Sequence, residues 1–300
     1  MTDQHTLFDD KEAGRLPAED ALSALDDLFR ASQTYSTSER YVELLRFIRK
    51  FPRYSPYNCF LLHVQKPSVS FVATPGQWER RFGRTIKRDA RPLVILAPMS
   101  PVLFVFGAQD TEGKPLPATL TDPFATNGIL HEGVWEKTQL NLPRDRILLI
   151  EEEMDRSKAG SIMKALLTDL VFLDGVKTKA NYRMKLNKAL DVGGRYATLV
   201  HELGHLYAGH LGTPNARWWD DRRGLTIEQR EFEAESISYF VCGRAGIATP
   251  SDAYLADYLR ESRFIPPISL ECVLKVAGQI EAMSKRKLPP RKDDAKPSSL

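Results

Sequence analysis

Two histidines four residues apart, His201 and His205, constrain the fold of this 300-residue chain more than any other feature. Residues four apart lie on one face of an α-helix, so a helix here presents both imidazoles to a single metal ion. Glu202 lies about a third of a turn round the helix, where its carboxylate can reach a water on that ion without itself binding the ion. The run from His201 to His205 therefore predicts a helix that carries two metal ligands and a base.

The HExxH spacing of these residues is typical of zinc peptidases, in which zinc lowers the pKa of a bound water and the glutamate takes its proton. Apolar residues at 197–200 and 206–208 favour a buried helix, and Gly209 and Gly212 predict where it ends. The alternative is an amphipathic helix with surface histidines, because so short a motif also arises by chance. Buried imidazoles need partners, so a zinc site also requires a ligand further along the chain.

That third ligand is expected in the acidic segment 231–235, Glu-Phe-Glu-Ala-Glu. A capping box at residues 226–229 predicts the start of a helix that carries this segment. Glu231 and Glu235 share one face of this helix, and Glu233 points away from it. The simplest assignment makes Glu231 the third zinc ligand and Glu235 a hydrogen-bond acceptor for a histidine, with the reverse assignment left open. The competing interpretation is an ordinary solvated acidic face.

His210 is the nearest other candidate for a place in the metal site. It follows His205 by five residues, so in a continuing helix it would lie off the face that carries the ligands. We therefore expect His210 to be a group at the helix end that supports a ligand, with direct binding of zinc as the alternative.

Composition and charge favour a soluble protein of the cytoplasm. A 300-residue chain with 42% hydrophobic residues can bury one large core or two modest ones. The sequence has no apolar run of membrane-spanning length, and its first residues do not resemble a signal peptide, so no membrane partner is expected. Cys59, Cys242 and Cys272 are few and widely spaced, which indicates reduced thiols. The net charge of +3 identifies no partner by itself.

Basic and aromatic residues are interleaved between residues 46 and 91. Cations bind phosphates and aromatic faces stack on unpaired bases, so this pattern favours single-stranded DNA as a partner. A solvated basic helix face above core aromatics is an equally good interpretation of the composition. The candidate DNA-binding residues in this stretch are Arg53, Tyr54, Trp78, Arg80, Arg81, Arg84, Lys87 and Arg88.

The order of motifs in the same stretch resembles the N-terminal single-stranded-DNA-binding domain of ArdC-type antirestriction proteins. A helix at 38–50 is followed by Asn58 after a Ser-Pro segment, then by Gln-x-Pro, Trp, a Gly-Arg-x-x-Lys turn and a strand that ends in Ala-Pro. The matching residues are Asn58, Gln65, Pro67, Trp78, Gly83, Arg84, Lys87, Ala97 and Pro98. The resemblance covers residues 22–113 and implies that Asn58 and Gln65 also contact DNA. The chain departs from the family at 88–91, Arg-Asp-Ala-Arg, where relatives often have a second glycine.

The second half of the chain resembles two related families at the metal motifs. HExxH followed by Glu231 and, four residues on, Glu235 is similar to ImmA/IrrE-type metallopeptidases. The run 231–247 is more similar to the metallopeptidase domain of ArdC-type proteins, which also tend to carry the extended HExxHxxxxH form that His210 matches. The first resemblance implies cleavage of a repressor in a stress response. The second implies antirestriction.

These observations predict an α+β protein with a single-stranded-DNA-binding domain followed by a gluzincin-like metallopeptidase domain. Strands are expected at 93–97, 102–106, 146–150 and 182–186, and an amphipathic helix at 160–173. The strand at 182–186 is expected to flank the metal helix and to accept a substrate peptide as an added strand. The expected divisions are a disordered tail at 1–17, the DNA-binding domain at 18–113, a linker at 114–140, the zinc metallopeptidase domain at 141–284 and a disordered tail at 285–300.

The predicted function is zinc-dependent peptide hydrolysis. Zinc is expected to be held by His201, His205 and Glu231, with Glu202 as general base and then general acid. A peptidase joined to a DNA-binding module is expected to cleave a regulatory or nucleic-acid-associated protein. The alternative is a non-proteolytic single-stranded-DNA-binding protein whose zinc site is structural or inactive.

Overall fold

The computed structural model describes residues 35, 37–51, 53–97, 102–116, 128–155, 158–173, 175–249, 255 and 264–291. Contacts divide the chain into two compact units, of which unit 1 comprises residues 1–36 and 46–125 and unit 2 comprises residues 37–45 and 126–300. Helices and small sheets occur together, which confirms a mixed α and β fold. The expected tail at 1–17 lies outside the described residues. No helix among the described residues is both long and apolar enough to cross a membrane.

Unit 1 is built round a three-stranded antiparallel sheet in the order β1-β4-β3. The predicted pairing of two strands in this region is confirmed, since Leu93 of β3 faces Val105 of β4. The expected helix at 38–50 is also present as α2, whose residues up to Leu45 belong to unit 2. In chain order, the elements as far as residue 113 are α2 (Ser38–Arg49), α3 (Pro56–Gln65), β1 (Val72–Ala73), α4 (Pro75–Phe82), β2 (Arg84–Ile86), β3 (Leu93–Leu96), β4 (Val102–Gly107), η3 (Ala108–Asp110) and β5 (Thr111–Gly113).

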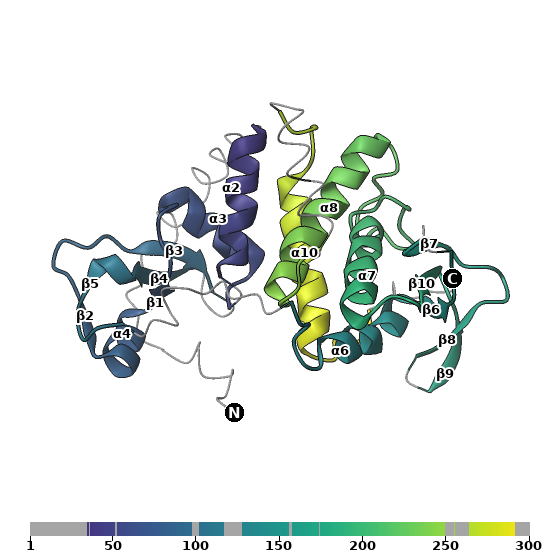
Figure 1. Ribbon diagram of the computed structural model, residues 1–300, viewed down its shortest axis with the longest axis horizontal. Helices are drawn as coiled ribbons and strands as arrows, with labels where there is room; N and C mark the ends of the chain where they lie inside the picture. The colour runs from purple at the N-terminus through teal and green to yellow at the C-terminus, as the bar shows by residue number, and fades with distance from the viewer. Residues whose placement is uncertain are drawn as a thin grey trace, which may run out of the picture. The chain divides into compact units, whose positions relative to one another are not determined.

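Unit 2 packs a group of helices beside a second three-stranded sheet, β6-β10-β7. Figure 1 shows α7 between this sheet and α8, with α10 on the other side of α8. The 16-residue helix α7 therefore contacts both the strands and the second long helix. The elements are α6 (Val134–Asn141), η4 (Leu142–Asp145), β6 (Ile147–Glu152), β7 (Gly160–Lys164), β8 (Leu170–Leu173), β9 (Val176–Lys179), β10 (Tyr182–Asn187), α7 (Val192–Tyr207), α8 (Ile227–Arg244) and α10 (Leu270–Lys285).

The prediction of a helix at 160–173 is wrong, because β7 and β8 occupy this segment. Its apolar residues pair across strands instead of forming one helical face: Ile162 faces Met184 in β10, and Leu173 faces Val176 in β9. A short apolar segment is compatible with the periodicity of a helix and with that of a strand. Pairing with residues distant in the sequence determines which of the two forms. Leu167 is consequently 85% exposed and belongs to no core.

The strand expected at 182–186 is present as β10 and contacts α7 as expected, but the prediction that it accepts an added peptide strand is wrong. β10 pairs in parallel with β6 on one side and antiparallel with β7 on the other, so both of its edges are occupied. An added peptide strand cannot hydrogen-bond to a strand that is already paired twice. The edge strand beside α7 is β7.

Two of the expected irregular segments contain ordered structure. The linker expected at 114–140 includes most of α6, which begins at Val134. The tail expected from 285 is described as far as Arg291, whose Nε donates to the buried carboxylate of Asp145 at 2.5 Å. Residues 292–300 lie outside the described part of the chain.

Candidate metal centre

Helix α7 places two imidazoles side by side. Asp191 caps the helix by accepting a hydrogen bond from the Gly194 N–H at 2.7 Å. His201 and His205 follow on one face of α7, and their Nε2 atoms lie 3.1 Å apart. The local prediction that this motif is helical is confirmed, and both imidazoles are directed to one point.

Helix α8 brings a carboxylate to the same point. The predicted capping box is present, with Thr226 and Gln229 exchanging hydrogen bonds at the first turn. Glu231, one turn further on, places its Oε2 3.7 Å from the His201 Nε2 and 3.5 Å from the His205 Nε2. The three residues form a group whose ligand atoms all lie within 4.8 Å of one another.

The spacing of these atoms fits one bound metal ion. Four ligands arranged tetrahedrally at about 2.05 Å from an ion lie about 3.3 Å from each other. The three observed separations, 3.1, 3.5 and 3.7 Å, are close to that value. The Glu231 side chain is 44% exposed, so the group is open to solvent on the side of this glutamate. A metal ion held here would keep a position for a water or a substrate.

The electrostatics of the group suit metal binding. Burial, and secondarily the neighbouring His205, lowers the pKa of His201 to about 4. The contact with His205 lowers the pKa of Glu231. At neutral pH His201 is therefore neutral and Glu231 is ionised, which are the forms that bind a metal.

Glu235 occupies a different position from Glu231. Its Oε1 lies 3.6 Å from the His201 Nδ1, the ring nitrogen that is not directed at the ligand group. A carboxylate in that place can orient an imidazole but cannot share an ion with it. Of the two glutamates left open by the sequence, the structure brings Glu231 to the ligand atoms of both histidines.

Glu202 lies next to β7. Burial raises the pKa of its carboxyl group, while His205 and a hydrogen bond from the Ile162 backbone N–H act against this shift. Gly160 allows α7 to approach the strand, because a Cβ at this position would lie 2.6 Å from the Thr198 Cγ2. The close packing of helix and strand places the Glu202 carboxylate along the backbone of β7.

His210 returns to the site through the turn that ends α7. Gly209 has a φ of +79°, and the His210 N–H donates to the His205 carbonyl at 3.0 Å while the Gly209 N–H donates to Leu206. These two bonds form a Schellman motif, which reverses the chain after the helix. The His210 Nδ1 consequently lies 3.0 Å from the His205 Nδ1, so His210 contacts a ligand and is not part of the ligand group itself.

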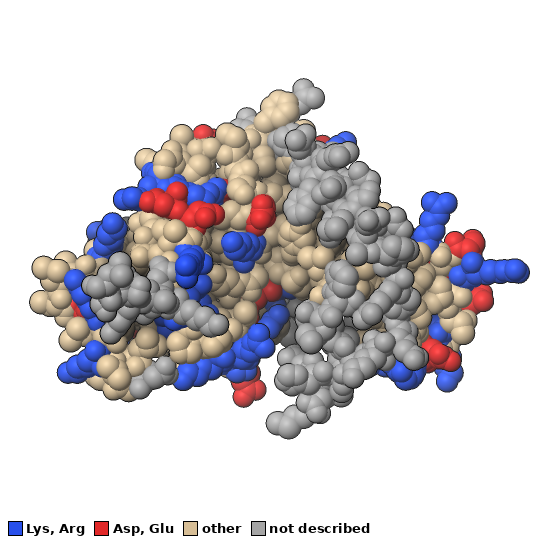
Figure 2. Space-filling model, turned by 180° about the vertical axis from the view of Figure 1, so that it is seen from behind, with Lys and Arg blue, Asp and Glu red and all other residues tan. Residues whose placement is uncertain are grey.

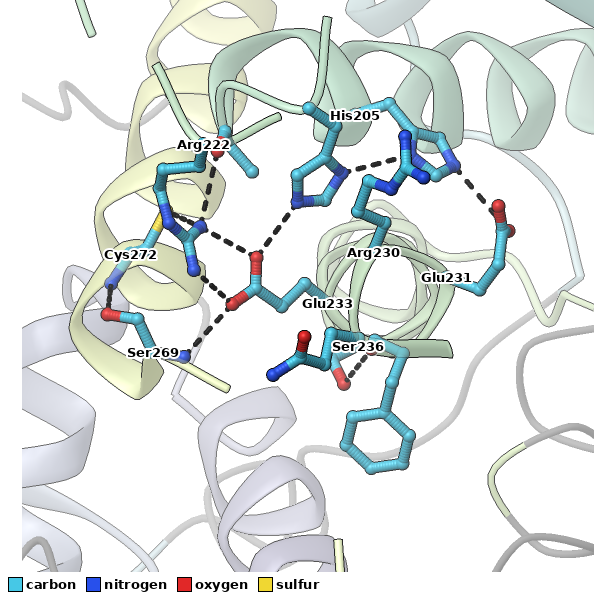
Figure 3. A network of polar contacts seen from close by, with 12 residues as sticks. His205, Arg222, Arg230, Glu231, Glu233, Ser236, Ser269 and Cys272 are labelled. Carbon is cyan, nitrogen blue, oxygen red and sulfur yellow. Dashed lines mark hydrogen bonds and ion pairs between the residues drawn. The ribbon is translucent and has the colours of Figure 1, made fainter. Parts of the chain in front are cut away.

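The sequence missed the residues that hold His210 in place. Its Nε2 lies 2.9 Å from the Glu233 Oε2, and Arg222 pairs with both oxygens of the same carboxylate at 2.7 and 2.6 Å. Figure 3 shows dashed contacts that run from Glu231 to His205, through the ring of His210 to Glu233, and on to Arg222 and Cys272. The sequence indicated only that Glu233 points away from the face that carries Glu231 and Glu235. It did not predict a role for Glu233.

Three residues expected to contact DNA form hydrogen bonds within unit 1. The side-chain amide of Asn58 forms two hydrogen bonds with the backbone of Leu96, at 3.0 and 2.9 Å. Gln65 does the same with Val94, at 2.8 Å in both directions. Trp78 is completely buried and donates to the Phe106 carbonyl at 2.9 Å, so its ring offers no face to a base. Pro98, which belongs to the same family pattern, lies outside the described residues.

The expected basic residues have different surroundings. Arg84 is half-buried and donates to the side chain and carbonyl of Thr111, and Lys87 donates to the Gln109 carbonyl. Figure 2 shows Lys and Arg spread over the visible face and interspersed with Asp and Glu. The remaining expected cations are exposed, namely Arg53, Arg80, Arg81 and Arg88.

A hollow on unit 1 combines cations with aromatic rings. Arg53 and Arg81 both line it, and Tyr54, Phe71 and Phe82 contribute their rings to its wall. The Tyr54 hydroxyl donates to the Val72 carbonyl at 3.0 Å, which fixes the position of its ring. The hollow therefore brings two of the predicted cations together with aromatic rings.

Comparison with protein-family models, with curated proteins and with solved structures found no match. The class of site is therefore defined by its geometry: two imidazoles and one carboxylate that can bind a metal ion, with a second carboxylate beside them.

Proposed function

We propose that this protein is a zinc-dependent metallopeptidase. The observation that carries the proposal is the ligand group of His201, His205 and Glu231, with Glu202 one residue from the first ligand. Two histidines and a glutamate form the ligand set of one well-known class of catalytic zinc sites, whereas structural zinc sites usually contain cysteines. No cysteine belongs to the group that the described residues form.

In peptide hydrolysis the ligands would hold the metal ion, and Glu202 would transfer the proton. Bound zinc supplies a Lewis acid that polarises the scissile carbonyl and lowers the pKa of the attacking water. Glu202 takes the proton from that water and passes it to the leaving amine. Burial raises the pKa of Glu202, which makes its carboxylate a better proton acceptor than an exposed one.

The edge of β7 suits an extended substrate. Bonds at its two ends, from the Ala165 N–H to the Asn181 carbonyl and from the Asn187 N–H to the Ala159 carbonyl, show which residues face β10. The backbone groups of Ser161 and Met163 also point toward β10, whereas the backbone N–H of Ile162 points to the opposite edge and donates to the Glu202 carboxylate. Along the described part of the chain, this second edge of β7 pairs with no strand. A peptide that adds here would pass beside Glu202.

Removal of the metal tests the proposal directly. The zinc-loaded protein is expected to cleave an unstructured polypeptide, and a chelator is expected to stop the cleavage because Glu202 alone cannot polarise the carbonyl. Zinc added in slight excess over the chelator should restore it. The measurement is the appearance of fragments by mass spectrometry. Absence of cleavage by the zinc-loaded protein across a library of unstructured peptides would contradict the proposal.

We further propose that unit 1 binds single-stranded DNA at the hollow lined by Arg53, Arg81 and the three aromatic rings. Guanidinium groups bind phosphates, and the half-buried rings of Tyr54 and Phe82 are placed to stack on bases. A peptidase with this property would act on a protein found at nucleic acid. The family resemblances favour antirestriction or stress-response regulation as its role.

The double variant Arg53→Gln with Arg81→Gln tests the DNA proposal. We expect weaker binding of a fluorescent oligonucleotide and a salt dependence whose log–log slope falls by about 0.7 for each phosphate that the protein no longer neutralises. The matched control is Lys177→Gln with Lys179→Gln, which removes two exposed charges from β9 of unit 2. An equal fall in affinity in both double variants would mean that only total charge matters, and would sink the proposed location.

A further inference from the structure

A buried run of polar contacts extends from the metal ligand His205 into the interior of unit 2. The His205 Nδ1 lies 3.0 Å from the His210 Nδ1, and the His210 Nε2 lies 2.9 Å from the Glu233 Oε2. The side chains of His210 and Glu233 are 1% and 0% exposed. Burial of two ionisable side chains is costly unless each is paired, so this arrangement is not incidental to the packing.

Glu233 is fixed as an ionised acceptor. Arg222 donates to both of its oxygens, and the Ser269 backbone N–H donates to Oε1 at 2.9 Å. A carboxylate whose two oxygens both accept from one guanidinium group is in its ionised form. An ionised carboxylate only accepts hydrogen bonds, so the proton between Glu233 and His210 belongs to the His210 Nε2.

The remaining proton positions follow from this one. Neutral imidazole carries a single N–H, so His210 with its proton on Nε2 has a lone pair on Nδ1. The His205 Nδ1 must then be the donor in the contact between the two rings. His205 in turn has its lone pair on Nε2, the atom directed at His201 and Glu231. The buried contacts thus select the one neutral tautomer of His205 that can bind a metal through Nε2.

We propose that His210, oriented by Glu233 and Arg222, is a positioning residue that sets the tautomer and ring orientation of His205 for metal binding. The inference rests on the metal centre proposed above and assigns a role to residues outside the ligand group. A metal-bound histidine commonly donates its other N–H to a carboxylate. Here a second histidine stands between the ligand and the carboxylate.

The two ligand histidines are supported differently. The His201 Nδ1 lies 3.6 Å from the Glu235 Oε1, and the Glu235 side chain is 21% exposed. His205 instead contacts His210, which in turn contacts the fully buried Glu233. The turn at Gly209 places His210 against His205. Only glycine fits in this turn, because a Cβ at residue 209 would lie 2.0 Å from the Asp220 carbonyl oxygen. The position of His210 is therefore built into the backbone.

A pair of variants isolates the acceptor on His205. His210→Asn keeps an oxygen near the position of Nδ1, so it can still accept the His205 proton, whereas His210→Leu removes the acceptor at similar size. Both variants lose the hydrogen bond to Glu233. The Glu233 carboxylate still accepts hydrogen bonds from Arg222 and Ser269. The probe is Co²⁺ alone, measured by chelator competition and by its visible absorption bands. Thermal unfolding of the metal-free proteins provides the control for folding.

We expect His210→Leu to bind Co²⁺ about 10- to 100-fold more weakly than the wild type, with shifted absorption bands. His210→Asn should bind at least about tenfold more tightly than His210→Leu. Equal weakening in the two variants, or wild-type affinity in both, overturns the positioning role while the metal centre stands. Failure of the wild type to bind Co²⁺ or Zn²⁺ overturns the proposed function and this inference together.

Discussion

Replacement of Glu202 by glutamine should lower the rate of peptide hydrolysis by about 10²- to 10⁴-fold, the usual contribution of a general base. The substitution keeps the size of the side chain and its contact with the Ile162 backbone of β7. It removes the negative charge that takes a proton from water. Because Glu202 does not belong to the group that could hold a metal ion, metal content should stay at the wild-type level.

The measurement is kcat on a cleavable peptide, taken with metal analysis of the same samples. Glu136→Gln, which neutralises an exposed carboxylate on α6, is the matched control and should leave kcat unchanged. Wild-type turnover by metal-loaded Glu202→Gln would rule out its role as the base. Survival of the biological activity in this variant would favour the alternative of a DNA-binding protein with a structural metal site.

The parts of the site that sequence could predict are those set by local periodicity. His201 and His205 are one turn apart in α7, and the capping box at Thr226 correctly gave the start of α8. Both follow from helix geometry and backbone capping, which depend on neighbouring residues only. Whether Glu231 or Glu235 meets the histidines depends on how α7 and α8 pack. At Gly204 the helices approach so closely that an added Cβ would lie 3.4 Å from the Ala234 Cα.

His210 and Glu233 show where sequence spacing fails. The offset of five residues places His210 off the ligand face only if the helix continues, and α7 instead ends at Tyr207 with the positive φ of Gly209. The turn brings His210 back to His205. Glu233 points away from Glu231 as expected, but that direction leads into the core, where Arg222 from the loop before α8 neutralises it. No local pattern could predict this partner.

The DNA-binding residues illustrate a different limit. Asn58, Gln65 and Trp78 belong to a pattern that resembles a DNA-binding family, yet their side chains bind the backbone of neighbouring strands. A family pattern shows which residues recur. It does not show whether those residues stabilise the fold or contact a ligand. The exposed Arg53 and Arg81 carry the proposal better, because their side chains are open to solvent.

Replacement of Glu231 by alanine should have the other large effect, the loss of metal. Its Oε2 is near both Nε2 atoms, so the variant leaves only two ligands to hold an ion. The fall in affinity should exceed the about 10- to 100-fold that removal of a supporting residue causes. Because the side chain is 44% exposed, the substitution opens no core cavity and the fold should persist.

Glu235→Ala is the matched control, since it removes a carboxylate from the same helix, one turn away. This residue faces the other nitrogen of His201, so the effect of its removal should stay within the range of a supporting residue. Circular dichroism and thermal unfolding of the metal-free variants establish that both are folded.

Zinc affinity of the wild type, Glu231→Ala and Glu235→Ala, measured by competition with a chromogenic chelator, tests the metal centre most directly. We predict one zinc per wild-type chain, no measurable zinc in Glu231→Ala, and zinc retained by Glu235→Ala with reduced affinity. The account is contradicted if the wild type binds no zinc, or if Glu231→Ala holds zinc as tightly as the wild type while Glu235→Ala loses it.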